Sequence, residues 1–188
     1  GFDTPTFATL VERHAIRSTV LPPAAMTMLC DDPEIASLAP LRYVRSITAP
    51  LSPFQARRFN ERFGVRVLNG YGQAEIGEVI GWTAADSKAH PGKVGAIGKP
   101  HPGVEIGLDA PDANGVGELL VKPPNTATDL APDRLTAGGF VRTGDLARVD
   151  AEGFVWIEGR LGDLINRGGN KVFPAEVEEV LLATQGVR

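Results

Sequence analysis

The chain has little cysteine: Cys30 is the only one in 188 residues. A single thiol cannot close an internal disulfide, so a disulfide framework is excluded and a reducing, cytoplasmic compartment is expected. No histidine or second cysteine stands near Cys30 in the sequence, so the spacing of a metal site or of a catalytic thiol is also missing.

The sequence has neither a long apolar run nor a strong excess of one charge. No run approaches the roughly 20 apolar residues of a membrane-spanning helix, so no stable membrane insertion is expected. The 19 Lys and Arg against 23 Asp and Glu give a net charge of −4, which argues against a nucleic acid as partner. With 43% hydrophobic and 22% charged residues, the composition is that of an ordinary globular protein.

The two ends of the chain suggest a larger context. Position 1 is glycine rather than methionine, and residues 180–188 stop where another element is expected to begin. We therefore expect the chain to be a segment of a longer protein.

Residues 1 to about 90 alternate between helix and strand patterns. Helices are predicted over 5–14 and 24–29, and strands over 18–21, 43–48 and 65–68. Strand–helix–strand units of this spacing predict parallel strands joined by right-handed crossovers. Because ligands bind beyond the carboxyl ends of such strands, the segments 48–51 and 69–75 are candidates for a site.

The clearest helix signal follows residue 51. Ser52 and Gln55 fit an S-x-x-Q capping box, and Pro53 takes the first helical position. Phe59 lies on its apolar face, and Gly64 provides a left-handed stop.

After residue 90 the pattern changes to short strand-like runs separated by turns, typical of a small antiparallel barrel or sandwich. The runs are 104–106, 117–122, 139–142, 147–149 and 154–157, with an exposed loop expected over 123–137. A Gly-rich loop follows Arg160, and a helix is predicted from Pro174. The predicted fold class is α/β: part of a parallel α/β sheet layer (1–90), a small antiparallel β-barrel subdomain (91–160), and the hinge and start of a small C-terminal α+β domain (161–188).

A β-hairpin is predicted around the turn Asp150–Gly153. The assumed register pairs Val149 with Phe154, Ala147 with Trp156 and Asp145 with Glu158. This register brings Asp145 and Arg160 together at the open end of the hairpin. A carboxylate beside a guanidinium can clamp a vicinal diol such as that of a ribose. A structural salt bridge at a strand end explains the same pair, so both interpretations stay open.

The segment G-Y-G-Q-A-E at 70–75 combines features of a ligand site. Gly70 and Gly72 let the backbone approach a ligand closely, and Tyr71 can offer its ring to a base. Glu75 is an oxygen ligand suited to Mg²⁺. An ordinary turn explains the two glycines equally well.

Four motifs, taken in order, place these features in one context. They are S-I-T-A-P-L at 46–51, N-G-Y-G-Q-A-E at 69–75, F-V-R-T-G-D-L at 140–146 and E-G-R-L-G-D-L-I-N-R-G-G-N-K-V-F-P-A-E-V-E at 158–178. Over essentially its whole length the chain resembles the adenylate-forming superfamily of acyl- and aryl-CoA synthetases, peptide-synthetase adenylation domains and luciferases. The joint pattern R-T-G-D-L, G-R-x-x-D-x-I and P-x-E-x-E is its most specific part.

The resemblance implies a reaction in two steps. A carboxylate attacks the α-phosphate of Mg·ATP to give an acyl-adenylate and pyrophosphate, and a thiol, usually that of CoA, then displaces AMP. ATP or AMP, Mg²⁺ and CoA are therefore the implied cofactors, with a small carboxylic acid as partner and fatty acid metabolism as the setting. Protein groups mostly position the reactants and neutralise charge as pyrophosphate leaves.

The resemblance also implies a role for each matching residue. Asp145 would hold the ribose hydroxyls with help from Arg160, Tyr71 would stack on the adenine, and Glu75 would be the catalytic residue that coordinates Mg²⁺. The implied nucleotide-binding set is Thr48, Ala49, Pro50, Asn69, Gly70, Tyr71, Gly72, Gln73, Ala74, Asp145, Ile157 and Arg160. Gly162 would be the hinge between domains, and Gly168 and Gly169 would belong to the CoA-binding loop.

Three departures from the family pattern qualify this interpretation. The Gly/Ser/Thr-rich phosphate loop and the catalytic Lys are absent and are expected upstream of Gly1 and downstream of Arg188, so the segment alone is predicted to be inactive. Ala74 replaces a Thr whose hydroxyl reaches the α-phosphate, and such a hydrogen bond is worth ~1.5–3 kcal/mol, or about 10- to 100-fold in rate. Ile47 and Thr48 replace two glycines, which predicts a narrower substrate pocket.

Three functions remain open from the sequence. The first is an acyl-CoA synthetase, and the second is an adenylation domain that loads a carrier-protein thiol. The third is a non-catalytic nucleotide-binding homologue, which Ala74 favours. The retained Tyr71, Glu75, Asp145 and Arg160 favour an enzyme.

Overall fold

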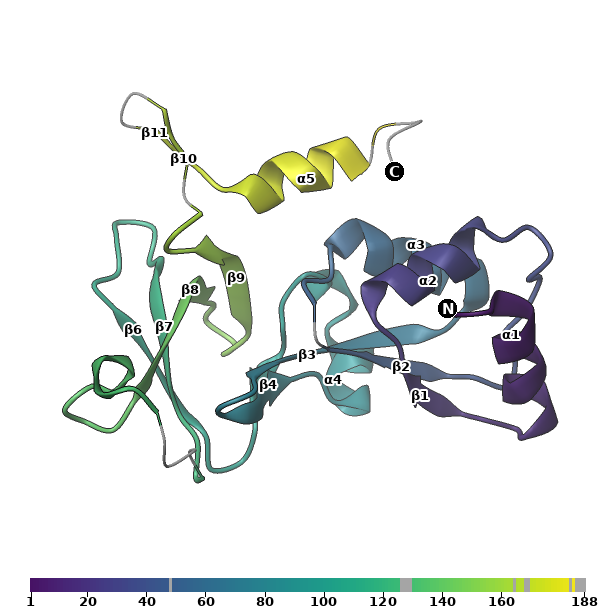
Figure 1. The fold of residues 1–188 in the computed structure, drawn as a ribbon, viewed down its shortest axis with the longest axis horizontal. Helices are drawn as coiled ribbons and strands as arrows, with labels where there is room; N and C mark the ends of the chain where they lie inside the picture. The colour runs from purple at the N-terminus through teal and green to yellow at the C-terminus, as the bar shows by residue number, and fades with distance from the viewer. Residues whose placement is uncertain (48, 126–129, 164, 168–169, 183, 185–188) are drawn as a thin grey trace. The chain divides into compact units, whose positions relative to one another are not determined.

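The structure is a computed structural model that describes the chain except for residues 48, 126–129, 164, 168–169, 183 and 185–188 (Figure 1). The chain divides into two compact units. The first is formed by Gly1–Gly70 with Trp82–Gly95, and the second by Tyr71–Gly81 with Ala96–Arg188. Each unit has its own hydrophobic core. Among the described residues, no helix has the length and apolar character needed to cross a membrane.

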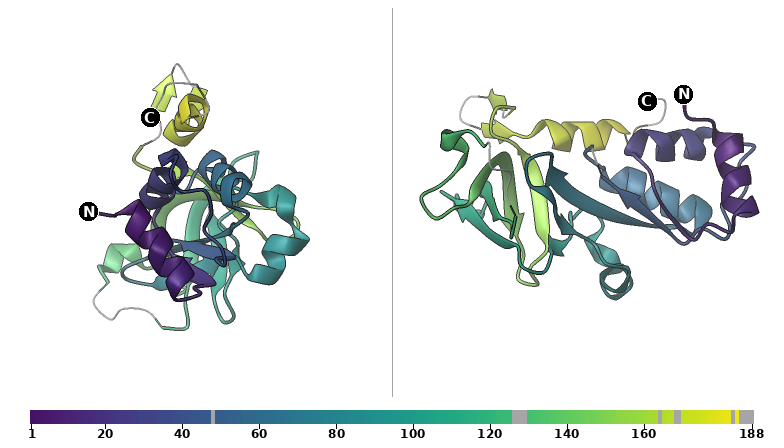
Figure 2. Two further views of the ribbon diagram at one scale, coloured as in Figure 1. Left: turned by 90° about the vertical axis from the view of Figure 1, so that its right-hand side faces the viewer. Right: turned by 60° about the horizontal axis from the view of Figure 1, so that its bottom comes forward.

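The first unit is a layered α/β structure, as predicted. Its helices are α1 (Thr4–Arg13), α2 (Pro23–Asp31), α3 (Pro53–Phe63) and α4 (Ala84–Ala89), and its strands are β1 (Ser18–Val20), β2 (Tyr43–Ser46) and the first part of β3 (Arg66–Gln73). β1 pairs with β2, and β2 with β3, both in parallel, which confirms the predicted pairing. α2 and α3 lie on one face of these strands and α4 lies on the other (Figure 1, Figure 2).

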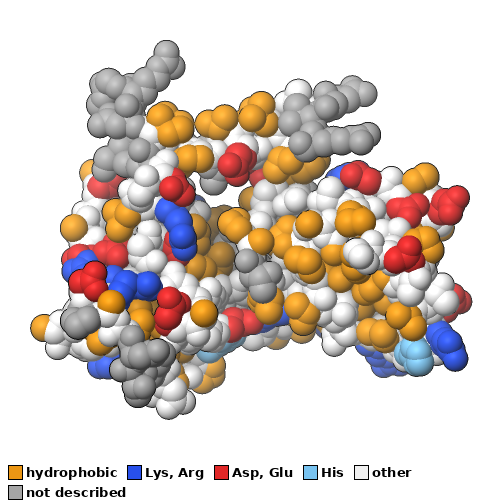
Figure 3. Space-filling model, in the orientation of Figure 1, with side chains coloured by type: hydrophobic (Ala, Val, Ile, Leu, Met, Phe, Trp, Pro, Cys, Tyr) orange, Lys and Arg blue, Asp and Glu red, His pale blue; other side chains and the backbone are white. Residues whose placement is uncertain are grey.

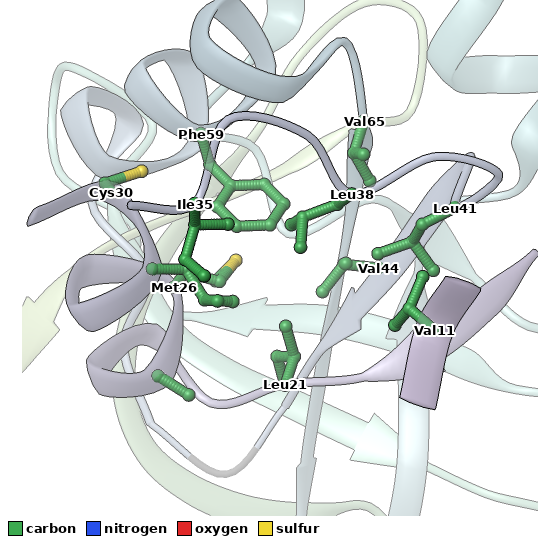
Figure 4. Close-up of a cluster of buried hydrophobic side chains, with 12 residues drawn as sticks. Val11, Leu21, Met26, Cys30, Ile35, Leu38, Leu41, Val44, Phe59 and Val65 are labelled. Atoms are coloured by element: carbon green, nitrogen blue, oxygen red, sulfur yellow. The ribbon is translucent and has the colours of Figure 1, made fainter. Parts of the chain in front are cut away.

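The core of the first unit lies between the helices and the parallel strands. Figure 4 shows side chains from α1, α2, α3 and β2 pointing into one cluster. Val11 on α1, Phe59 on α3 and Val44 on β2 have no exposed surface, so helices and strand each contribute fully buried side chains to this core. Cys30 also lies in this cluster, and burial raises the pKa of its thiol, so the thiol stays protonated at neutral pH.

α3 begins and ends where the sequence predicts. The Gln55 backbone N–H donates to Ser52 Oγ at 3.1 Å, and the Ser52 backbone N–H donates to Gln55 Oε1 at 3.3 Å. Gly64 adopts a φ of 69° and closes the helix. Gln55 Nε2 also donates to Thr27 Oγ1 on α2 at 3.1 Å. The capping box therefore fixes both the start of α3 and its contact with α2.

The second unit is mainly antiparallel, as predicted. Its four-stranded sheet has the order β6 (Glu105–Asp109), β7 (Gly117–Lys122), β8 (Val141–Val149), β9 (Val155–Arg160). β4 (Gly77–Gly81) pairs antiparallel with β5 (Lys99–Pro100), and an isolated bridge joins Gly98 to Val155 on β9. The runs 139–142 and 147–149, expected to be separate, are joined by the single strand β8, which begins at Val141. This strand continues through Gly144, whose φ of 75° a side chain would strain.

The segment 69–75 differs from the prediction. It is not a loop beyond a strand, because β3 continues to Gln73 and β4, which was not predicted, runs beside it. Gly72 permits this arrangement: a Cβ atom there would stand 2.0 Å from the carbonyl oxygen of Gly77 on β4. Only glycine allows the two strands to approach so closely. The short helix α4 was also not predicted.

The chain after Arg160 forms a hairpin and a helix. β10 (Ile165–Arg167) and β11 (Asn170–Val172) pair antiparallel, so strands occupy much of the expected Gly-rich loop. α5 (Pro174–Leu182) begins at the predicted proline. Its side chains Val177, Val180 and Leu181 are exposed, and Figure 3 shows apolar side chains along this segment.

Candidate functional site

β8 and β9 form the predicted hairpin with a different register. The assumed pairing of Val149 with Phe154 is wrong, because Val149 pairs with Val155. The Asp150 backbone N–H donates to the Phe154 carbonyl oxygen at 2.9 Å, so these two residues close the ladder around a three-residue loop. Gly153 in this loop has a φ of 82°, as the third residue of such loops often does.

The end of the hairpin brings the two predicted ribose-binding residues together. A β-bulge between Leu146 and Ala147 shifts the register once more, so Asp145 pairs with Arg160 and not with Glu158 as expected. Arg160 Nε donates to Asp145 Oδ1 at 2.9 Å. The predicted proximity is therefore confirmed, although the register from which we predicted it is wrong.

The backbone around Asp145 is held by its neighbours. Thr143 Oγ1 donates to the Leu119 carbonyl oxygen at 2.8 Å and accepts the Asp145 backbone N–H at 3.1 Å. The Gly144 carbonyl oxygen accepts the Leu161 backbone N–H at 3.0 Å. Hydrogen bonds made by Thr143 and Gly144 thus hold the backbone of β8 in place at Asp145.

The Asp145 carboxylate is buried and accepts hydrogen bonds from several side chains. The Tyr71 hydroxyl donates to Oδ2 at 2.5 Å, and Gln73 Nε2 contacts the same oxygen at 3.3 Å. With Arg160, three side chains donate to a carboxylate that is only 7% exposed. Such partners are what make a buried carboxylate tolerable. The carboxylate in turn raises the pKa of Arg160, so this guanidinium remains charged.

Tyr71 lies between the core of the second unit and Asp145. Its side chain packs against the buried cluster that includes Ile80 and Val155. Burial raises the pKa of the Tyr71 phenol, and the hydrogen bond to Asp145 raises it further. The hydroxyl therefore stays protonated and remains a donor. Its stacking on an adenine stays a prediction.

A cavity of about 560 Å³ opens beside this network, within the second unit. It is lined by Gln73, Glu75, Arg134, Thr143, Gly144, Arg160, Leu161, Gly162 and Asp163. The structure thus gathers predicted residues from β3, β9 and the segment after β9 around one space. Asp145 is bonded to two of the lining side chains, Gln73 and Arg160.

Arg134 is a lining residue that the sequence analysis missed. It ends a 3₁₀ turn, Pro132–Arg134, inside the segment expected to be an exposed loop. Arg134 Nη2 donates to Gln73 Oε1 at 2.8 Å, and Nε donates to the Arg142 carbonyl oxygen at 2.9 Å. No motif marks this arginine, because its partners are 8 and 61 residues away along the chain.

Glu75 could supply one carboxylate ligand to a metal ion, but not a complete set of protein ligands. Its side chain is 41% exposed and lies 3.7 Å from Arg134 Nη1. No cluster of three or more His, Cys, Asp or Glu suitable for a metal occurs in the described part of the chain. Mg²⁺ often takes one or two carboxylates and completes its shell with phosphates and water. Glu75 therefore suits a Mg²⁺ ion that arrives with a phosphate.

The other predicted residues are distributed over both units. Gly72 and Ala74 flank Gln73 and are exposed, and Ile157 is half-buried on β9. Ala49, Pro50, Asn69 and Gly70 belong to the first unit, where Ala49 and Pro50 are exposed. Thr48, Gly168 and Gly169 lie outside the described residues.

Comparison with known proteins gives consistent matches. The sequence model of the family described as "AMP-binding enzyme" matches residues 1–129. The chain is 33% identical to sulfoacetate–CoA ligase of Cupriavidus necator over 93% of its length and 36% of that protein. It is 30% identical to fatty acid–[acyl-carrier-protein] ligase MmaC of Mycobacterium marinum, over 100% of the chain and 39% of the relative.

The fold is also similar to that of a solved structure of a CoA synthetase. O-succinylbenzoate coenzyme A synthetase from Bacillus subtilis, solved in complex with AMP, superposes with a TM-score of 0.78 at 26% identity. This match covers 98% of the chain and 39% of that structure. The chain therefore spans little more than a third of the length of these proteins.

Proposed function

Because this chain belongs to the AMP-binding enzymes, we propose that the cavity of its second unit binds the ribose and phosphate of an adenine nucleotide. We further propose that the protein containing this chain is an AMP-forming acid–CoA ligase. It would activate a carboxylic acid with ATP to an acyl-adenylate and transfer the acyl group to CoA.

The pair Asp145 and Arg160 is the observation that carries the proposal. As a structural salt bridge it would contribute little, because the Arg160 side chain is 62% exposed and exposed ion pairs are worth about 0–1 kcal/mol. As a diol clamp its geometry is useful. The carboxylate accepts from ribose hydroxyls, and the adjacent guanidinium, which lines the cavity, donates to their oxygens.

The hydrogen-bonding capacity of Asp145 is compatible with this role. A carboxylate offers about four acceptor positions. Tyr71, Gln73 and Arg160 use three of them, and the Gln73 contact is the longest at 3.3 Å. One hydroxyl can therefore bind directly, and a second can bind if it displaces the Gln73 amide.

The remaining wall of the cavity suits the phosphates. Arg134 lies beside Gln73 and Glu75, so one cation and one metal-compatible carboxylate share this part of the cavity. Mg²⁺, when bound, would neutralise phosphate charge, with Glu75 as its protein ligand. The chain's own contribution is to orient the ribose and hold the phosphate in line for attack by the carboxylic acid.

The thiol acceptor has a specific alternative. MmaC is named as a fatty acid–[acyl-carrier-protein] ligase, and its similarity extends over the whole chain. CoA remains our first proposal because it is named for the sulfoacetate ligase and for the succinylbenzoate synthetase. Transfer assays with free CoA and with an acyl-carrier protein distinguish the two acceptors.

The activity is tested by carboxylate-dependent ATP–pyrophosphate exchange. The full-length protein that contains this chain is assayed with sulfoacetate, oxalate, fatty acids and aromatic acids, beside the 188-residue chain alone. We expect exchange with at least one acid by the full-length protein only. Asp145→Asn should lower its rate about 10- to 100-fold, since a hydrogen bond to a charged group is lost.

Arg148→Gln is the matched control for this assay. This variant also breaks an ion pair between β8 and β9, since Arg148 Nε lies 2.7 Å from Glu158 Oε1. Unlike Arg160, Arg148 does not line the cavity. Its exchange rate should match that of the wild type. Exchange by no form of the protein, with AMP still bound, would replace the ligase by a non-catalytic nucleotide-binding protein.

A further inference from the structure

We propose that Arg134 is a phosphate-binding residue of the cavity and supplies the donor that Ala74 lacks. The inference rests on the proposed nucleotide site. It assigns the phosphate end of that site to a residue that lies outside the four sequence motifs. Ala74 has no side-chain donor. Arg134 contacts Gln73 and Glu75, the two residues on either side of Ala74.

The geometry leaves part of the Arg134 guanidinium available. Nε and Nη2 are engaged by the Arg142 carbonyl oxygen and by Gln73 Oε1. Nη1 lies 3.7 Å from Glu75 Oε1, which is longer than a hydrogen bond. Among the described residues Nη1 therefore makes an ion pair and no hydrogen bond. The side chain is 34% exposed and lines the cavity, so an anion can reach it.

The charges around the cavity favour this assignment. The lining includes two cations, Arg134 and Arg160, and two carboxylates, Glu75 and Asp163. Arg160 is held by Asp145, at the end proposed for the ribose. Arg134 is the cation at the opposite end of this hydrogen-bonded chain, linked to Asp145 through the amide of Gln73. A nucleotide with its ribose at Asp145 would find its next charge partner at Arg134.

Glu75 and Arg134 would also separate when a nucleotide binds. In the structure the two side chains face each other as an ion pair. If Glu75 turns to a metal that accompanies the phosphates, the guanidinium loses its carboxylate and gains the phosphate oxygens. A charge-assisted hydrogen bond from Nη1 to a phosphate oxygen is stronger than a neutral hydrogen bond. Arg134 can therefore replace a hydroxyl at position 74 in holding the phosphate.

The direct test compares two ligands that differ only in the phosphate. AMP and adenosine are titrated by calorimetry onto the full-length protein, its Arg134→Gln variant and the control Arg148→Gln. Arg134→Gln should weaken AMP binding about 10- to 100-fold and leave adenosine binding unchanged, because only AMP loses a charged hydrogen bond. The control should bind both ligands as the wild type does.

A double-mutant cycle tests the link to position 74. If a hydroxyl and the guanidinium reach the same phosphate, Ala74→Thr should recover part of the AMP affinity that Arg134→Gln loses, and the two effects should not add. Fully additive effects would contradict the replacement of the hydroxyl by Arg134. Arg134→Lys, which keeps the charge, should keep most of the preference for AMP over adenosine.

Two results would overturn the inference. If Arg134→Gln weakened AMP and adenosine equally, Arg134 would serve only to position Gln73; if it changed neither, Arg134 would have no part in binding. Failure of the proposed function has a different signature. In that case the wild-type protein would bind neither ligand, and the inference would fall with the site on which it rests.

Discussion

At the scale of single residues, the site depends on how Asp145 is accommodated. The carboxylate is 7% exposed, and hydrogen bonds from Tyr71, Gln73 and Arg160 compensate for its burial. Each of these residues is distant from Asp145 in sequence: Tyr71 and Gln73 lie on β3, and Arg160 lies at the end of β9. Removing the Tyr71 hydroxyl leaves the buried carboxylate short of a partner, which costs more than an ordinary hydrogen bond is worth.

Tyr71→Phe removes the hydroxyl that donates to Asp145 at 2.5 Å. We expect the free energy of unfolding at pH 8 to fall by about 1–3 kcal/mol. Folding raises the pKa of the Tyr71 phenol above its value near 10 in the unfolded chain. The contribution of this hydroxyl to the free energy of unfolding is therefore fully present below pH 10 and declines as the pH rises above it. The gap between wild type and variant should therefore narrow above pH 10.

The measurement is urea unfolding of both proteins between pH 8 and 11. Tyr43→Phe serves as the control, since Tyr43 lies on β2 and is the only other tyrosine. A stability gap for Tyr71→Phe that stayed constant from pH 8 to 11 would show that the hydroxyl does not titrate as this geometry requires.

At the scale of elements, the capping box of α3 joins local sequence to tertiary contact. Ser52→Ala removes the acceptor of the Gln55 backbone N–H, so the free energy of unfolding should fall by about 1 kcal/mol. Ser52→Thr keeps the acceptor and should remain within about 0.5 kcal/mol of the wild type. Urea titrations measure both; equal stability of Ser52→Ala and the wild type would mean that packing alone sets the start of α3.

Elements with strong local signals were predictable from the sequence. Ser52, Pro53 and Gly64 define α3 within the chain itself, and the structure has the helix at those limits. The extension of β3 to Gln73 was not predictable, because two glycines in five residues favour a turn. Only the presence of β4 beside Gly72 explains why this segment is a strand, and that contact is tertiary.

The candidate site shows the same division. The motifs marked Asp145 and Arg160, and the structure places the two together, but through a bulge and a three-residue loop that change the register twice. Arg134 could not be found from the sequence, because it sits in a loop without a motif and meets Gln73 only through folding. Residues defined by spacing were predictable, and residues defined by long-range packing were not.

At the scale of the whole molecule, the described cavity belongs to one compact unit. Its lining comes from β3 and the turn after it, the 3₁₀ turn, β8, β9 and the segment after β9. The chain corresponds to 36% of the sulfoacetate–CoA ligase it resembles, so the reaction proposed here is a property of the protein that contains it. The contribution that we propose for this chain is a ribose clamp and a phosphate-binding arginine.

A calorimetric titration of the full-length protein with AMP and with 2′-deoxy-AMP tests directly whether Asp145 binds the ribose hydroxyls. A diol clamp at Asp145 predicts that the missing hydroxyl weakens binding about 10-fold or more, since a hydrogen bond to a charged group is lost. In Asp145→Asn this preference should largely disappear. Equal affinity of the wild-type protein for both nucleotides would show that Asp145 clamps no diol and would leave Asp145 and Arg160 as a structural ion pair.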